Sequence, residues 1–100
     1  MTHELLQTEL QEPESGRWVR VDLTLDQDRI ARGVAETSSL PLLEETVRAV
    51  LDACRGRRRA DVIDLTPGQL HEALSDARLR DDDVAFALRA VQQALLERTH

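Results

Sequence analysis

The sequence contains a single cysteine, Cys54, and this scarcity excludes two classes of protein. One thiol cannot form a disulfide within the chain, so a small secreted fold held together by disulfides is excluded. One thiol also cannot hold zinc or an iron–sulfur cluster in the way that sites built from several cysteines do. We therefore expect a reduced protein that is stabilised by its hydrophobic core.

Other residue types are also scarce. Trp18 and Phe86 are the only aromatic residues, so the core must be built from aliphatic side chains. There is no lysine, asparagine or tyrosine, and all 13 basic residues are arginines. With 100 residues, of which 41% are hydrophobic, the chain has enough apolar material for one domain with one modest core.

Charge and hydropathy narrow the set of partners. The net charge of −6 disfavours binding to nucleic acid or to an anionic membrane, because phosphates attract cationic surfaces. No apolar stretch approaches the ~20 residues that a membrane span needs. No basic segment followed by an apolar run suggests a signal peptide. We expect a cytoplasmic protein, a monomer or weak dimer, that binds neither nucleic acid nor membrane.

Two segments in the first half of the chain have strand character. Residues 18–25 alternate between apolar and polar side chains, which is the period of a β-strand. Residues 26–28 have turn chemistry, and residues 30–37 form a weaker second strand. Gly33 within that strand suggests a bulge or a close approach of another segment. Together these segments predict a β-hairpin.

The second half of the chain predicts three helices. A hydroxyl cap and an early proline in residues 38–41 begin the first helix, and Gly56 ends it. Residues 66–69, with the sequence Thr-Pro-Gly-Gln, form a capping box that begins the second helix. Three aspartates, residues 81–83, lead into the third. The predicted core residues are Val19, Val21, Leu23, Val47, Leu51, Cys54, Leu70, Leu88, Val91 and Leu95.

These elements predict an α+β fold in two layers. A hairpin sheet with one apolar face must be covered, and the helices that follow can cover it. We expect a small antiparallel sheet with three helices on one face, in the order ββααα. Residues 1–16 are polar and acidic and are expected to form a flexible N-terminal arm, so the single domain would span residues 17–100.

Four features of this sequence occur together in one known family. They are a Pro-Glu-Ser-Gly segment at 13–16, a serine pair at 38–39, a helix end at 55–56, and an alanine-rich last helix over 84–95. In their order and spacing, residues 12–96 resemble the IscU/NifU-type iron–sulfur cluster assembly scaffolds. The resemblance implies a SufE/NifU-like fold.

The same resemblance implies which positions would carry the family's chemistry. Its scaffolds hold a cluster or a zinc ion with three cysteines and neighbouring aspartate and histidine residues. The positions of this sequence that match those ligands are Ser15, Arg17, Leu40, Asp82 and Asp83. Hard oxygen groups do not replace soft thiolate ligands. The resemblance therefore implies a degenerate, non-enzymatic scaffold-like protein with no metal, no cofactor and no catalytic residues. Such a protein would bind or regulate a partner in iron–sulfur biogenesis, such as a cysteine desulfurase or a cluster-handling protein.

Two charged clusters have both a structural and a functional interpretation. Arg55, Arg57, Arg58 and Arg59 follow the first helix, where cations complement the negative end of the helix dipole. The alternative is a docking patch for an acidic partner. The aspartates at 81–83 suit the positive end of a helix dipole, and the alternative is a site for a hard cation.

Two other functions stay open. Residues 62–96 can be interpreted as a helix-turn-helix DNA-binding unit, although three aspartates would begin its recognition helix and phosphates repel them. The chain can also be an interaction subunit unrelated to metals.

Overall fold

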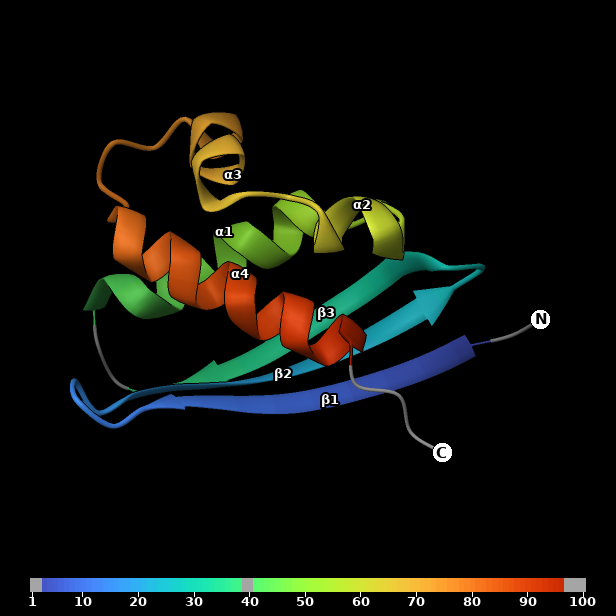
Figure 1. Ribbon diagram of the computed structural model, residues 1–100, viewed down its shortest axis with the longest axis horizontal. Coiled ribbons are helices and arrows are strands. Elements are labelled where there is room, and N and C mark those ends of the chain that lie inside the picture. The colour runs from blue at the N-terminus through green and yellow to red at the C-terminus, as the bar shows by residue number, and fades with distance from the viewer. Residues whose placement is uncertain (1–2, 39–40, 97–100) are drawn as a thin grey trace.

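The computed structural model describes residues 3–38 and 41–96 of the chain. The elements in these residues are β1 (His3–Glu12), β2 (Arg17–Asp26), β3 (Arg29–Thr37), α1 (Pro41–Cys54), α2 (Arg59–Ile63), α3 (Pro67–Leu74) and α4 (Asp81–Leu96). The strands form one antiparallel sheet in the order β1-β2-β3, and the helices lie together on one face of it (Figure 1). The predicted two-layer α+β fold is confirmed.

Strand β1 corrects the prediction of a flexible arm over residues 1–16. It pairs with β2 along the whole length of both strands. Leu6 and Thr8 are buried against the helices, and Leu10 packs partly on the same core. Because a threonine occupies the middle of this apolar row, the alternation was too weak to indicate a strand. The folded domain therefore includes β1.

Helix α2 corrects the predicted helix count. The described residues contain four helices after three strands, so the predicted order ββααα is wrong. With only five residues, α2 is too short to show a helical period in its sequence. Its C-terminal end is held by α4, since the side-chain amide of Gln92 donates to the carbonyl oxygens of Val62 and Ile63 at 3.1 and 3.2 Å. This short helix thus depends on a tertiary contact.

The core lies between the sheet and the helices and is almost entirely aliphatic. Every residue predicted for the core is buried, including Cys54, which is 0% exposed. Phe86 is the aromatic residue of this core, whereas Trp18 is half-buried at the edge. The core prediction is confirmed because strand and helix periods identify inward-facing positions without any knowledge of their partners.

Gly33 marks a close approach between the two layers. A Cβ atom at this position would lie 2.9 Å from Leu51 Cδ2 and 3.2 Å from Leu23 Cδ2. The bulge of the hairpin lies two residues earlier, at Ala31, where the pairing of β2 with β3 shifts by one residue. A side chain at residue 33 would therefore require the ends of Leu51 and Leu23 to shift.

Two of the predicted helix ends are found, whereas the cap predicted for the first helix falls partly on residues 39–40, outside the described residues. The side chain of Thr66 accepts a hydrogen bond from the Gln69 backbone, and the Gln69 side chain accepts one from the Thr66 backbone, which completes the capping box of α3. Gly56 follows α1 in the left-handed conformation, with φ +84°. The N-terminal ends of α1 and α4 lie beside the β1–β2 turn, at one end of the sheet (Figure 1).

Candidate functional site

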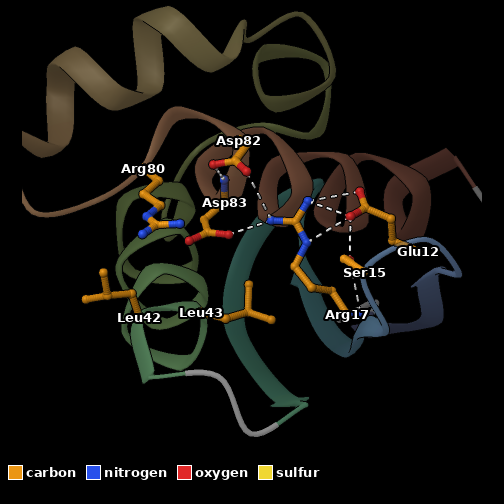
Figure 2. A pocket seen from close by; sticks show the side chains of 8 residues that line it. All are labelled: Glu12, Ser15, Arg17, Leu42, Leu43, Arg80, Asp82 and Asp83. Carbon is orange, nitrogen blue, oxygen red and sulfur yellow. Dashed lines mark hydrogen bonds and ion pairs between the residues drawn. The ribbon is translucent and has the colours of Figure 1, made fainter.

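A cavity of about 420 Å³ lies at that end of the sheet. Figure 2 shows side chains that converge on it from the β1–β2 turn, the first turn of α1 and the start of α4. One wall is apolar and comes from α1, and the opposite wall is charged. The lining residues are Glu12, Ser15, Arg17, Leu42, Leu43, Arg80, Asp82 and Asp83.

The cavity gathers most of the positions that matched the family's ligands. Four of them line it, although they are far apart in the sequence: Ser15, Arg17, Asp82 and Asp83. The fifth position, Leu40, lies outside the described residues, and Leu42 two residues further on is in the cavity wall. The fold thus brings together the residues that the sequence comparison selected by order alone.

Arg17 is the centre of the charged wall. Its Nη1 donates to Asp83 Oδ1 at 2.5 Å, and its Nη2 donates to the two carboxylate oxygens of Glu12 at 2.8 and 2.9 Å. The guanidinium carbon also lies 4.8 Å from the centre of the Phe86 ring, a cation–π arrangement. The Arg17 side chain is only 11% exposed. It is therefore held on both sides by carboxylates and below by an aromatic face.

The hydrogen bonds of this network favour the charged forms of Glu12 and Arg17. Ser15 Oγ donates to Glu12 Oε1 at 2.6 Å, and this bond, followed by the bonds from Arg17, lowers the pKa of Glu12 below its ordinary value. Burial works to lower the pKa of Arg17, but its hydrogen bonds to Glu12 and Asp83 outweigh burial and raise it. Glu12 and Arg17 therefore stabilise each other as a carboxylate and a guanidinium cation.

The three aspartates at the start of α4 have separate roles. Asp83 is buried and pairs closely with Arg17. Asp82 is 69% exposed, its Oδ2 lies 3.7 Å from Arg17 Nη1, and its Oδ1 accepts from the Asp83 backbone at 3.1 Å. Asp81 contacts the imidazole of His71, which connects α4 to α3. Within residues 3–38 and 41–96, no group of three or more His, Cys, Asp or Glu side chains is arranged to hold a metal ion.

The residues of the cavity do not fit an iron–sulfur cluster or a thiolate-bound zinc ion. They provide hydroxyl, carboxylate and guanidinium groups, and a guanidinium repels a metal cation. Cys54 is at the other end of α1 and faces the core. Burial raises the pKa of the Cys54 thiol to about 11, so the thiolate that binds metals does not form near neutral pH.

Glu12 is the member of the network that the sequence did not indicate. Glu12 ends β1 and Arg17 begins β2, so the two residues flank the four-residue turn and lie opposite each other in the strand register. Recognition of β1 as a strand would have placed these two charged side chains side by side. The contact of Arg17 with α4, in contrast, has no local signal in the sequence.

The four arginines predicted as a docking patch do not act as one group. Arg59 is bound internally, since its guanidinium forms ion pairs with Glu4 and Asp28. Arg57 donates from Nε to the Ala53 carbonyl oxygen at 3.0 Å, so it caps the C-terminal end of α1. Arg55 and Arg58 are exposed.

No protein-family model matches this chain, and no curated protein matches it. In the part of the chain that the structure describes, no helix combines the length and the apolar character that crossing a membrane requires. Function is therefore inferred from the cavity and from the charged surfaces.

Proposed function

We propose that this chain is a non-catalytic binding protein with an IscU/NifU-type scaffold architecture, in which an arginine–carboxylate network replaces the cluster ligands. One observation carries the proposal. Ser15, Arg17, Asp82 and Asp83, which match ligand positions of that family, line a single cavity between the β1–β2 turn and α4. A chance resemblance in sequence order would not require these separated positions to meet in space.

The network explains what such a protein would lose and keep. Arg17 adds a positive charge where the family has an aspartate, and its bonds to Glu12 and Asp83 occupy the carboxylates that could attract a cation. The loss of thiolates removes cluster binding. The end of the sheet, however, keeps an outer wall of apolar and charged groups.

That outer wall is suited to protein binding. Leu42 is half-buried at the apolar side of the cavity, and Arg80 is exposed beside it. Apolar groups surrounded by charged groups are typical of protein interfaces. We infer that a cysteine desulfurase or a cluster-handling protein binds at this end, and that the chain competes with or regulates a scaffold that carries a cluster.

Calorimetry with a purified cysteine desulfurase from the same organism tests this function. We expect a complex whose affinity falls about tenfold or more in Leu42→Glu, because a carboxylate would enter the apolar part of the interface. Arg48→Glu, an exposed change on the same helix outside the cavity, is the control and should bind like the wild type. Absence of binding to desulfurase and to cluster carriers would exclude the proposal.

Anaerobic reconstitution with iron and sulfide tests the second half of the proposal. We expect no stable visible absorbance from the wild-type chain after removal of unbound iron, because the cavity has no thiolate ligand. A stable cluster bound by a single chain would show that the site has not lost the scaffold activity.

The packing of α4 argues against the helix-turn-helix alternative. A recognition helix needs an exposed face that enters the major groove. Most of α4 is instead buried, and Gln93 donates to Thr8 Oγ1 of β1 at 2.7 Å. The exposed residues of its first turn include Asp81 and Asp82, which phosphates repel.

An interaction subunit unrelated to metals stays the second candidate. It would share the fold and the closed ion-pair network but would not bind a desulfurase. The binding experiment with Leu42→Glu separates the two, since only the proposed function requires the cavity wall to contact a desulfurase.

A further inference from the structure

The end of the molecule opposite the cavity carries a cluster of four arginines from two segments, the start of β3 and the connection between α1 and α2. Figure 1 shows the β2–β3 turn, the C-terminal end of α1 and the start of α2 together at this end. Arg29 begins β3, Arg55 and Arg57 follow α1, and Arg58 precedes α2. We call Arg29, Arg55, Arg57 and Arg58 the basic end patch.

Backbone hydrogen bonds hold this patch in place. Ile30 N donates to the Arg57 carbonyl oxygen at 3.0 Å, and Gly56 N donates to the Ile30 carbonyl oxygen at 2.7 Å. Arg29 and Arg58 form an isolated antiparallel bridge. Residues directly opposite in such a bridge place their side chains on the same face, with Cα atoms about 4.5–5.5 Å apart. The backbones of two arginines are thus held side by side at this end of the molecule.

None of the four arginines is neutralised in the part of the chain described here. No ion pair involves them, although Asp26 lies opposite Arg29 in the register of β2 with β3. The neighbouring Arg59 shows the contrast, because it forms ion pairs with Glu4 and Asp28. Four arginines without an ion pair among the described residues therefore lie at one end of a chain whose net charge is −6.

Helix capping explains only part of this arrangement. Arg57 uses Nε for the Ala53 carbonyl oxygen, and Arg29 uses Nη1 for the Gly56 carbonyl oxygen at 2.9 Å. Neither guanidinium group makes another hydrogen bond within the described residues, and the side chains of Arg55 and Arg58 make none there. Like charges directly opposite across a bridge are destabilising. An anionic partner would remove this cost.

We propose that the basic end patch binds an acidic peptide segment of a partner protein through guanidinium–carboxylate pairs. The fork of an arginine guanidinium matches the two oxygens of a carboxylate. Glutamate and aspartate side chains along an extended peptide can reach several of the four arginines at once. Because the patch lies at the opposite end from the cavity, this inference does not depend on the proposed function.

The overall charge favours a peptide over nucleic acid. A DNA duplex carries phosphates over a surface much larger than four side chains, so binding would bring them against the acidic remainder of the protein. A short acidic peptide covers the patch without this repulsion. Aspartates 26 and 28 at the β2–β3 turn limit the basic area further.

Fluorescence anisotropy with a labelled polyglutamate peptide tests the proposal. We expect binding at low ionic strength that weakens as salt is added, because exposed charge pairs are screened. Arg55→Glu/Arg58→Glu should lower the affinity about tenfold or more, since two attractive pairs become repulsive. Both substitutions are at exposed positions outside the helices, so the fold should be retained, and thermal unfolding checks this.

Arg48→Glu/Arg89→Glu is the matched control, with the same change in net charge at exposed positions outside the patch. It should bind the peptide within about twofold of the wild type. Equal loss in both double variants, or no binding at low salt, would overturn the proposal. Tighter binding to a DNA duplex than to the peptide would also overturn it. Leu42→Glu should leave peptide binding unchanged, which separates this result from the test of the cavity.

Discussion

Arg17 Nη1 and Asp83 Oδ1 are 2.5 Å apart although 66 positions separate the two residues in the sequence. This ion pair connects the start of β2 to the first turn of α4, and both side chains are almost buried. Together with Glu12, it holds the β1–β2 turn against the helical layer. Arg17 and Asp83, which match ligand positions of the scaffold family, thus form an ion pair that joins the sheet to the helical layer.

Removal of Arg17 should destabilise the protein. In Arg17→Met the Asp83 carboxylate, whose side chain is 12% exposed, would stay in place without its partner. Loss of one member of such a pair leaves an uncompensated charge, and we expect the free energy of unfolding to fall by about 3 kcal/mol. Urea denaturation measures this change.

A control and a double variant sharpen that prediction. Arg48→Met breaks an exposed pair with Glu44, with side chains 70% and 71% exposed, and should cost less than about 0.5 kcal/mol. Arg17→Met/Asp83→Leu should recover most of the loss, because both charges are then replaced by apolar groups. Equal stability of Arg17→Met and Arg48→Met would show that the buried pair contributes nothing.

The network should also give the stability a dependence on acidic pH. The bonds from Ser15 and Arg17 lower the pKa of Glu12 in the folded state, so folding favours its ionised form. The stability from Glu12 is therefore present above its ordinary pKa of 4.5 and is lost as the pH falls below that value.

Comparison of wild type with Glu12→Gln at several pH values measures this contribution. We expect the difference in unfolding free energy to be constant near neutral pH and to shrink as the pH falls from about 5 toward 3. Ser15→Ala, which removes the bond that lowers this pKa most, should reduce the same difference. A difference that does not change with pH would contradict the assignment.

A methyl group at Gly33 should be poorly tolerated. In Gly33→Ala the new Cβ would lie 2.9 Å from Leu51 Cδ2, inside the packed interface of α1 with the sheet. We expect a loss of about 1–2 kcal/mol, measured by thermal or urea unfolding, because overpacking forces neighbouring side chains to shift. Combination with Leu51→Val should cost less than the sum of the two single changes.

Gly68→Ala is the control for that substitution. Nothing lies within 4 Å of the position where its Cβ would be, and Gly68 is in the first turn of α3. This variant should be neutral or more stable by up to about 1 kcal/mol, because alanine restricts the unfolded chain. Equal effects at positions 33 and 68 would indicate a backbone cause rather than the contact with Leu51.

Cys54 should be unreactive in the folded protein and should couple stability to alkaline pH. Folding raises its pKa from 9.0 to about 11, so in the unfolded chain the thiol ionises first as the pH rises. Its contribution is therefore complete below pH 9.0 and is lost progressively as the pH rises through about 11.

Two measurements check this behaviour. A thiol reagent at pH near 8 should modify Cys54 at a rate that follows global unfolding, which urea accelerates. The difference in stability between wild type and Cys54→Ala should decrease above pH 9.0. Rapid modification without denaturant would contradict the burial of this side chain.

Restoration of thiolates offers a direct test of the scaffold resemblance. The variant Ser15→Cys/Leu40→Cys/Asp83→Cys, with Arg17→Asp, would place three cysteines and an aspartate at the positions that match the family's ligands. We expect it to bind one zinc ion in competition with a chromophoric chelator. The same variant with the third cysteine moved from position 83 to Arg89→Cys should bind zinc far more weakly. Equal affinities of these two variants would argue against the resemblance.

Local patterns in the sequence account for much of the fold. The alternation in residues 18–25, the capping box at Thr66 and the helix end at Gly56 each depend on neighbours a few residues away. Such patterns identified the hairpin, three of the helices and the residues of the core. They also predicted that Cys54 is a core residue and not a metal ligand, because its helical spacing placed it among buried aliphatic residues.

Only the tertiary structure decided the rest. Strand β1 is stabilised by its backbone pairing with β2. The C-terminal end of α2 is stabilised by the hydrogen bond from the Gln92 side chain to the Val62 carbonyl oxygen. The sequence by itself determined which side chains are available at Ser15, Arg17 and the aspartates of α4. Whether they bind a cation or one another depends on how close they lie in space. Arg17 and Asp83 are 66 positions apart in the sequence, and the packing of the two layers brings them together. The packing places the Arg17 cation between two carboxylates, and this turns a position that resembles a metal ligand into the centre of an ion-pair network.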